Sequence, residues 1–465
     1  MSKLIPGFPV DIGPAYEGER IRKEQMYVEF GGLKVPYKFE LVIACRPEEV
    51  EDGKVEVVGP DLMELKEGGS YPIGILVKVA GAKVDKDLEG VIERRIHEFI
   101  NYIQGVMHVN QRDQVWIRIS KYAVKKGLNS LKWIGLALIH LFKHHMPFIE
   151  KIEVTIYTDE AKVKELLEKL ARPRYEERDR RALSLRDEDV DTFYGCILCQ
   201  SFAPTHVCVI TPERPANCGA ISYLDARAAA AIDPKGPIFP IPKGKCLDPI
   251  AGEYEGVNEI VRQKSMGKIE RVKLYTAMDH PHTSCGCFEA IVFYIPEVDG
   301  FGIVHRDYRG VAVNGLRFSE MAAQTGGGLQ TPGFHGVSIL YMKSRKFLQA
   351  DGGWNRVVWM PSELKERVKD AIPPELYDKI ATEKDVSNVE ELKKWLIEKG
   401  HPLAAKLREM EEAKAKEEAA APAEAAAPEV AAPAAGIAVP TATAPIKIVL
   451  KGATIKIGKI VVRRR

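Results

Sequence analysis

Six of the eight cysteines of this 465-residue chain lie between positions 196 and 287, and four of them form one closely spaced group. That group consists of Cys196, Cys199, Cys208 and Cys218 and follows the pattern C-x2-C-x8-C-x9-C. Four thiolates at such spacing in an irregular, proline-containing loop can hold an iron–sulfur cubane or a zinc ion. Zinc sites of this kind usually contain two short C-x2-C turns, and this group has only one. The spacing therefore favours an iron–sulfur cluster and leaves zinc as the alternative.

A second motif, Cys285-Gly286-Cys287, places two thiols one residue apart. Their sulfurs can bind adjacent positions of one metal ion, and the deprotonated amides of Gly286 and Cys287 can add two nitrogens. This planar N2S2 set suits nickel(II) or copper(II) better than tetrahedral zinc. Glycine allows the tripeptide to bend around the ion without a Cβ clash. The alternative is that both cysteines are ordinary buried thiols.

The composition indicates a globular protein rather than a nucleic-acid-binding or membrane-spanning one. The net charge is +2, from 67 basic and 65 acidic residues, which argues against nucleic acid as the main partner. The first 20 residues lack the apolar segment of a signal peptide, and the apolar run from Trp133 to Phe142 is too short to span a bilayer. We therefore expect a cytoplasmic protein, in which clustered cysteines bind metal rather than form disulfides.

Strand-like and helical segments alternate along the chain. Strands are predicted at 26–30, 38–45, 54–58, 71–81, 114–120, 151–159, 287–296, 300–307 and 336–343. Helices are predicted at 86–104, where Asp85 is a candidate cap, and at 130–144 and 161–170. This alternation predicts a mixed α/β (α+β) fold with two α/β domains. The predicted division is 1–171 (first domain), 172–191 (charged linker or hinge), 192–411 (cysteine-bearing domain), 412–445 (flexible Ala/Pro/Glu linker) and 446–465 (basic, strand-like tail).

Three of these segments permit more than one interpretation. Residues 172–191 hold six arginines and seven acidic residues, which is typical of a hinge or of a charged helix packed on the first domain. The glycine-rich loop 324–336 lacks the Lys-Ser/Thr ending of a phosphate-binding loop, so its glycines are expected to permit unusual backbone angles or close approach to a cofactor. The tail could dock on an acidic partner or merely aid solubility.

The segments YGCILCQSFAPTHVC, ERPANCGA and TSCGCFE resemble the metal-cluster motifs of the acetyl-CoA synthase family. The resemblance covers about residues 1–400 and is strongest to the archaeal form, the beta subunit of the acetyl-CoA decarbonylase/synthase complex. Bacterial members carry a large additional N-terminal domain that docks on carbon monoxide dehydrogenase. This chain has no room for that domain, which puts a directly shared gas tunnel in doubt.

The resemblance implies a Ni–Ni–[4Fe–4S] cofactor, with the cubane held by Cys196, Cys199, Cys208 and Cys218. Cys199 would also bridge the cubane to a proximal nickel. Cys285 and Cys287 would bind that nickel through sulfur and, with the amides of Gly286 and Cys287, a distal nickel. Phe202 would lie over the proximal nickel, although a lone phenylalanine is more often a core residue. Three histidines near the cysteines are candidate hydrogen-bond donors or proton carriers: His206, His280 and His282.

The activity implied by the resemblance is that of an acyltransferase, acetyl-CoA synthase/decarbonylase. It assembles acetyl-CoA reversibly from CO, a corrinoid-borne methyl group and coenzyme A, through methyl-nickel and acetyl-nickel intermediates. The implied partners are carbon monoxide dehydrogenase subunits, a corrinoid iron–sulfur methyl carrier and ferredoxin. Coenzyme A carries phosphates, for which Arg112, Arg118 and the pair Arg94–Arg95 are candidate contacts, with Trp116 as a stacking partner for adenine. Each of these residues could instead be an ordinary surface arginine or core tryptophan.

Two other functions are compatible with part of the pattern. An electron-transfer or structural iron–sulfur subunit would need only the first four cysteines, and nickel would distinguish it because a simple electron carrier has no use for Cys-Gly-Cys. A zinc-stabilised scaffold would contain neither iron nor the colour of an iron–sulfur cluster.

Overall fold

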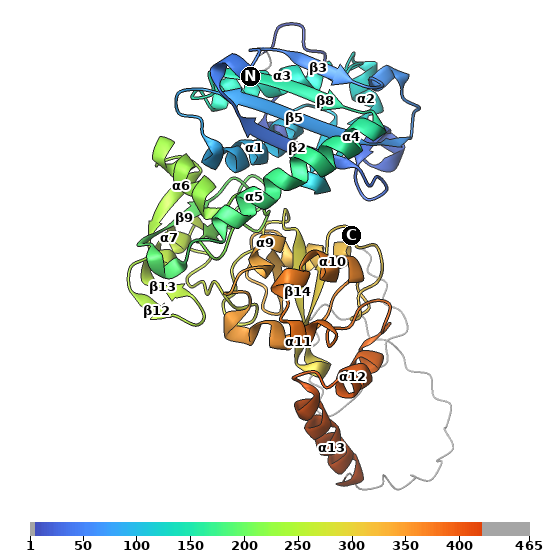
Figure 1. Ribbon diagram of the computed structural model, residues 1–465, viewed down its shortest axis with the longest axis vertical. Helices are drawn as coiled ribbons and strands as arrows, with labels where there is room; N and C mark the ends of the chain where they lie inside the picture. Colours follow the sequence, from blue (N-terminus) through green and yellow to red (C-terminus); the bar gives the residue numbers. More distant parts are fainter. Residues whose placement is uncertain (1–4, 421–465) are drawn as a thin grey trace, which may run out of the picture. The chain divides into compact units, whose positions relative to one another are not determined.

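Two four-stranded sheets form the amino-terminal part of the chain, in a computed structural model that describes residues 5–420 (Figure 1). The first sheet has the order β2-β5-β8-β3, with β2 at Lys38–Ala44, β5 at Ile73–Ala80, β8 at Lys151–Tyr157 and β3 at Val55–Val58. The second has the order β4-β1-β7-β6, with β4 at Ser70–Tyr71, β1 at Met26–Gly31, β7 at Trp116–Ser120 and β6 at Val106–Val109. Within the first sheet, β5 pairs in parallel with β2 and antiparallel with β8. Each of the six strands predicted for this part is present.

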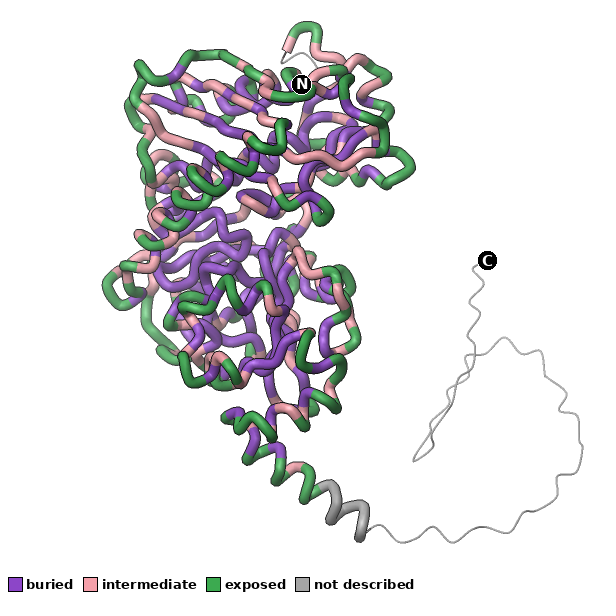
Figure 2. Tube along the Cα trace, turned by 45° about the vertical axis from the view of Figure 1, so that its right-hand side comes forward, coloured by how far each residue is buried: buried purple, intermediate pink, exposed green. Residues whose placement is uncertain are grey.

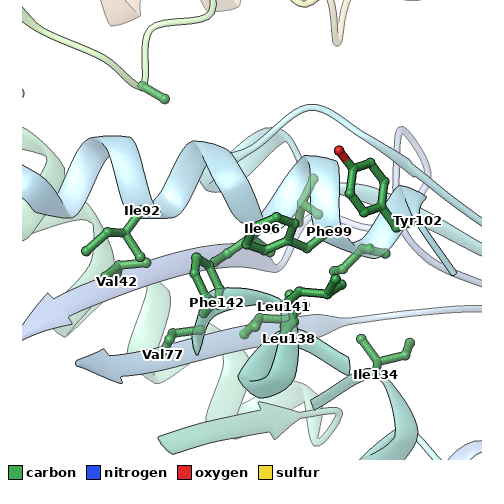
Figure 3. Packing of buried hydrophobic residues seen from close by; sticks show 14 of the residues in the cluster. Val42, Val77, Ile92, Ile96, Phe99, Tyr102, Ile134, Leu138, Leu141 and Phe142 are labelled. Atoms are coloured by element: carbon green, nitrogen blue, oxygen red, sulfur yellow. The ribbon is translucent and has the colours of Figure 1, made fainter. Parts of the chain in front are cut away.

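Helices α1 (Glu89–Asn101) and α3 (Lys132–His145) pack on one face of the first sheet (Figure 3). Alternate strand residues such as Val42 and Val77 point to this face, because side chains alternate along a strand. The helices meet them with Ile92, Ile96 and Phe99 of α1 and with Leu138, Leu141 and Phe142 of α3. Each such fully buried side chain contributes about 1.5–3 kcal/mol of hydrophobic stabilisation. The predicted cap is confirmed, since the Asp85 carboxylate accepts a hydrogen bond from the Asp87 N–H at the 3-10 turn that leads into α1.

The opposite face of the first sheet is covered by a helix that enters the predicted charged linker. α4 (Glu160–Leu166) continues through a π-helical turn, Leu167–Ala171, into α5 (Arg172–Ala182). Arg178 is buried and donates hydrogen bonds to Glu89 and to Glu93 of α1, each at 3.0 Å. Removing one partner of such a buried pair typically costs about 3–5 kcal/mol. Residues 172–182 therefore form the packed helix, while a hinge within 172–191 stays a prediction.

The remaining described residues carry three further sheets, of three, two and four strands. The first, in the order β10-β9-β11, consists of β10 (Cys208–Ile210), β9 (Thr192–Cys196) and β11 (Ile238–Pro242). β12 (Cys246–Asp248) and β13 (Glu253–Tyr254) pair with each other. The last, in the order β16-β14-β15-β17, consists of β16 (Phe334–Val337), β14 (Ala290–Ile295), β15 (Gly300–His305) and β17 (Val357–Trp359).

Helices surround these sheets, and one short helix, α2 (Lys121–Lys125), follows β7. The others are α6 (Tyr223–Ile232), α7 (Glu255–Lys264), α8 (Phe318–Thr325), α9 (Ile339–Met342), α10 (Ser362–Arg367), α11 (Pro374–Tyr377), α12 (Val389–Glu398) and α13 (Ala404–Ala420). The strand predicted at 336–343 is wrong beyond Val337, where α9 begins. Ser338 caps that helix by accepting a hydrogen bond from the Tyr341 N–H at 3.1 Å. A short apolar run does not by itself distinguish a buried strand from a buried helical turn.

The architecture is the mixed α/β fold that the sequence predicts. The chain up to Glu412 forms one compact unit, and the domain boundaries proposed within it stay predictions. Residues 412–420 of the predicted linker belong to α13, while 421–445 and the predicted tail, 446–465, lie outside the described residues. Among the described helices, none has the length and apolar character needed to cross a membrane.

The buried core of the first sheets extends into the loops that carry the cysteines. One continuous cluster of buried residues contains the core of α1 and α3 together with all six clustered cysteines. Figure 2 shows purple, buried chain between the amino-terminal sheets and the sheets that follow. Residues of the amino-terminal part and residues of the part that follows it therefore bury the cysteines together.

Candidate metal centre

Three buried cysteine sulfurs, those of Cys199, Cys285 and Cys287, all lie within 4.8 Å of one another. Cys199 comes from the turn that follows β9, and the other two come from the segment that precedes β14. No other group of three or more His, Cys, Asp or Glu side chains of this kind occurs within residues 5–420. Three sulfurs at this separation can bind one thiophilic metal ion.

The Cys-Gly-Cys turn has a backbone conformation that requires glycine. Gly286 has φ of 138°, in a region that favours glycine, although a Cβ there would meet only Phe202 at 3.9 Å. The glycine-rich loop contacts this turn through a backbone hydrogen bond, which the Gly327 N–H donates to the Cys285 carbonyl at 3.0 Å. Gly327 itself has φ of 88°. The loop therefore has the unusual backbone angles that the sequence predicts, at a position that contacts the turn.

The other three clustered cysteines lie close by but outside the three-sulfur group. Cys196 and Cys208 are directly opposite each other on β9 and β10, and Cys218 lies in the turn that follows β10. All three are buried and none forms a disulfide. Burial raises the pKa of Cys196 far above its ordinary value and raises the pKa of Cys218 to about 11. Such thiols become thiolates when a metal ion replaces their protons.

One side chain of α1, that of Arg94, reaches the sulfurs from the amino-terminal part of the chain. The Nη2 of Arg94 donates to the sulfur of Cys199 at 3.3 Å and lies 3.9 Å from the sulfur of Cys287. The imidazole of His97, on the same helix, lies 2.8 Å through its Nδ1 from Nδ1 of His108 and 3.4 Å through its Nε2 from the amide nitrogen of Asn101. Burial lowers the pKa of His97 to about 4, and the neighbouring Arg94 cation adds to this effect.

The polarity of this pocket fits an anionic group held by thiolates. Arg94 is only 2% exposed, and its Nη1 has no hydrogen-bond partner among the described residues. A buried, half-paired guanidinium is costly unless a negative group lies beside it. The pKa of Cys287 lies well below its usual range, because the thiols of Cys199 and Cys285 and the cation of Arg94 lie close to its sulfur. These residues therefore fit a metal cluster with thiolate ligands.

The predicted aromatic and histidine neighbours occupy different positions around this pocket. Phe202 is half-buried and its ring edge faces Gly286. His206 and His282 are buried and hydrogen-bond Thr283, at its hydroxyl (2.9 Å) and its carbonyl (2.6 Å), two residues before Cys285. His280 is exposed and pairs with Asp279. His206 and His282 therefore support the loop of the second cysteine pair, and His280 does not.

The candidate contacts for a phosphate-bearing ligand are divided between two places. Arg112 lines a cleft of about 1220 Å³ and pairs with Asp179 at 3.1 Å. Trp116 and Arg118 do not line this cleft, and both donate to the carboxylate of Glu29 at 2.8 Å. The structure thus separates Arg112 from the other two.

The cleft contains cations that the sequence analysis did not single out. Arg172, Arg309 and Lys343 line it and make no ion pair with any residue between 5 and 412. Glu289, two residues after Cys287, also lines the cleft. The cleft therefore extends to the segment that carries the cysteine pair. No local sequence signal marks these cations, because they come from distant segments.

Comparisons with known proteins match both parts of the chain. Residues 8–163 match the family described as CO dehydrogenase/acetyl-CoA synthase complex beta subunit, and residues 175–410 match the family of the C-terminal part of the ACS/CODH beta subunit. The chain is 59% identical over 470 residues to the acetyl-CoA decarbonylase/synthase complex subunit beta 2 of Methanocaldococcus jannaschii, covering 99% of this chain and 98% of that protein. It is 56% identical over 461 residues to the corresponding subunit beta of Methanopyrus kandleri, with coverage of 99% and 98%. A solved C-terminal domain of an acetyl-coenzyme A synthase alpha subunit is 42% identical, covers 26% of this chain and 96% of that one, and has a TM-score of 0.24.

Proposed function

We propose, because the chain belongs to the family of CO dehydrogenase/acetyl-CoA synthase complex beta subunits, that it catalyses the reversible assembly of acetyl-CoA from carbon monoxide, a methyl group and coenzyme A. The reaction is an acyl transfer in which the thiol of coenzyme A accepts the acetyl group. The observation that carries the proposal is the group of buried sulfurs of Cys199, Cys285 and Cys287, within 4.8 Å of one another. A simple electron carrier would have no use for such a second thiol pair.

The proposed cofactor is a Ni–Ni–[4Fe–4S] cluster. Its cubane would be held by Cys196, Cys199, Cys208 and Cys218, and its two nickel ions by Cys199, Cys285, Gly286 and Cys287. When bound, such a group supplies an electron-rich metal with open positions at which carbon–carbon bonds are made or broken. The residues of the chain would hold the thiolates and exclude water from the buried pocket. Phe202, beside Gly286, would restrict the space available to a ligand.

Coenzyme A is proposed to approach through the cleft lined by Arg112. The cleft offers about 1220 Å³, cations for phosphates, and a wall that reaches Glu289 beside the cysteine pair. Trp116 and Arg118 remain candidate contacts only if Glu29 releases them, because their polar groups are already bound to its carboxylate.

The proposed partners follow from the reactants. A methyl group would come from a corrinoid iron–sulfur protein, carbon monoxide from carbon monoxide dehydrogenase subunits, and electrons from ferredoxin. The named relatives are subunits of a complex, which supports a multisubunit assembly for this chain as well.

The experiment that tests the proposal is metal and sulfide analysis of the anaerobically purified chain. We expect about four iron and up to about two nickel per chain. A Cys285→Ser, Cys287→Ser double variant should lose nickel and retain iron. The matched control is Cys45→Ser, Cys246→Ser, which changes the two cysteines outside the clustered group and should retain both metals.

Two outcomes would overturn the proposal. Iron without nickel, even after reconstitution with nickel salts, would favour the electron-transfer function. Zinc alone would favour the scaffold. If both metals are present, exchange of CO with the carbonyl of acetyl-CoA is the activity to measure.

A further inference from the structure

The two peptide groups of the Cys-Gly-Cys turn each accept a hydrogen bond at the carbonyl oxygen. One peptide joins Cys285 to Gly286 and the other joins Gly286 to Cys287, and their nitrogens are the candidate metal ligands. The Gly327 N–H donates to the carbonyl of Cys285 at 3.0 Å, and Nη2 of Arg306 donates to the carbonyl of Gly286 at 2.5 Å. The first donor is a neutral backbone amide, and the second is a cation.

Backbone pairing and aromatic packing hold Arg306 in this position. It follows β15, and its N–H donates to the carbonyl of Glu289 at 3.0 Å, which extends the pairing of β15 with β14. Its guanidinium lies 5.7 Å from the ring centroid of Phe288 and 5.2 Å from that of Phe318. Nε and Nη2 also donate to the carbonyl of Phe288, at 3.3 and 3.0 Å. The side chain therefore contacts one carbonyl before Cys287 and one after it.

No carboxylate balances the charge of Arg306 among the side chains that the structure describes, those of residues 5–413. Within that range no Asp or Glu oxygen lies within 4.0 Å of its guanidinium. Its hydrogen-bond acceptors are backbone carbonyls, which carry no net charge. The side chain is half-buried. A cation in this position with only neutral partners is costly unless a negative charge develops beside it.

A negative charge develops at the Gly286 carbonyl when the nitrogen of the same peptide binds a metal ion. A peptide nitrogen becomes a ligand of planar nickel(II) only when it has lost its proton. Resonance within the peptide then shares the negative charge between the nitrogen and the carbonyl oxygen. A hydrogen bond from a cation to that oxygen stabilises the metal-bound form more than the free form. The turn already folds inwards, since the Cys287 N–H donates to the sulfur of Cys285 at 3.4 Å.

We propose that Arg306 is a positioning residue of the planar metal site, and that its cation compensates the negative charge on the peptide of Gly286 and Cys287 when nickel is bound. On binding, the ion replaces two thiol protons and two amide protons, which pass to the buffer. Zinc binds thiolates in a tetrahedral site and needs no amide nitrogen, so Arg306 should favour nickel over zinc. The presence of nickel rests on the proposed function, and the contacts of Arg306 do not.

The test compares Ni²⁺ and Zn²⁺ binding by the full chain and its variants under anaerobic conditions. Nickel is first removed with a chelator, and each ion is then titrated in competition with that chelator. The Cys285→Ser, Cys287→Ser variant measures ions bound elsewhere, and absorption and circular dichroism measure planar nickel.

Arg306→Met keeps the packing against the two rings and removes the charge and the donors. It should bind Ni²⁺ about 10–100-fold more weakly than the parent, because it lacks the hydrogen bond to the ligand peptide. Its affinity for Zn²⁺ should stay at the parental value. Arg306→Lys keeps the charge and should recover most of the nickel affinity.

The matched control is Arg356→Met. Arg356 is also half-buried, donates to the carbonyls of Asp299 and Asp351 at 2.9 and 3.2 Å, and packs on two aromatic rings. Its replacement should leave the affinities for both ions unchanged.

The inference is overturned if folded Arg306→Met keeps the parental nickel affinity, or if it loses nickel and zinc affinity to the same extent. It is also overturned if Arg356→Met loses as much nickel affinity, or if nickel in the parent shows no planar bands. Should Arg306→Met not fold, Arg306→Gln replaces it, with the same result expected. A parent that binds planar nickel but contains no iron when purified would count against the proposed function, and the ratio of nickel to zinc affinity would still decide the inference.

Discussion

The guanidinium of Arg94 donates a hydrogen bond to the sulfur of Cys199 at 3.3 Å, although the two residues are 105 positions apart in the chain. This contact joins the helix that covers the first sheet to the first turn of the cysteine region. The site therefore depends on how the amino-terminal part packs against the cysteine loops, and not on those loops alone.

The first prediction concerns the charge of Arg94. Arg94→Gln should lower the reduction potential of the proposed iron–sulfur cluster by on the order of 100 mV. A buried cation favours the reduced, more negative form, and two unit charges about 8 Å apart at an effective dielectric constant of about 20 interact by about 2 kcal/mol, which is about 100 mV. A redox titration followed by electron paramagnetic resonance measures the change. Arg94→Lys keeps the charge and should stay near the parent, and an unshifted potential in Arg94→Gln would contradict the prediction.

The second prediction concerns the turn between the paired cysteines. Gly286→Ala should cost about 1–3 kcal/mol of unfolding free energy, because φ of 138° is strained for a residue with a Cβ. It should also reduce bound nickel, because the turn must distort to relieve that strain.

The control for this prediction is Gly267→Ala, a second glycine with positive φ (75°) and open space around its Cβ position. It should lose similar stability and keep its nickel. Denaturation midpoints and metal analysis of both variants measure the two effects. Equal nickel in the two variants would show that the turn tolerates a Cβ.

Much of the site can be predicted from sequence because its ligands lie in local motifs. The closeness of Cys199 to Cys285 and Cys287 is what the family resemblance implies and not what the spacing alone implies. The Cys-Gly-Cys turn favours glycine for its backbone angle and not for the expected lack of room for a Cβ. The strands can be predicted for the same kind of reason, since alternation of apolar residues is a local pattern. The local pattern is misleading at Ser338. The apolar residues on both sides of it resemble one strand, but Ser338 is the cap at which a helix begins.

The contacts that depend on tertiary packing cannot be predicted in this way. Arg94 is a candidate for phosphate in the sequence and instead faces the sulfurs. Arg118 is held by strand register, because β1 and β7 place Glu29 directly opposite it. A cross-strand partner of this kind is invisible until the pairing of the strands is known.

The third prediction concerns the cleft. Arg309→Ala should weaken binding of coenzyme A by about tenfold, because a hydrogen bond to a charged group contributes about 1.5–3 kcal/mol and part of it is replaced by water. Arg180→Ala, at an exposed arginine that does not line the cleft, is the matched control and should leave affinity unchanged. Calorimetric titration of each variant with coenzyme A gives the dissociation constants. Equal affinities in the two variants would place the ligand elsewhere.

The fourth prediction concerns acid stability, through a buried histidine away from the cysteines. Burial lowers the pKa of His401 to about 4, below its ordinary value of 6.5. Between these values the unfolded chain binds a proton that the folded chain does not, so stability falls as the pH falls from about 6.5 towards about 4. The full effect of this one group is on the order of 3 kcal/mol.

His401→Gln should be less stable at pH 7.5, because the bond from Nε2 to the Val357 carbonyl is lost, but its unfolding free energy should change less between pH 7.5 and 5. Urea denaturation of the metal-free parent and variant at both pH values measures this change in unfolding free energy. The other buried histidines are present in both chains, so they do not contribute to the difference between them. Parallel pH dependence in the two chains would mean that His401 accepts a proton in the folded state as readily as in the unfolded one.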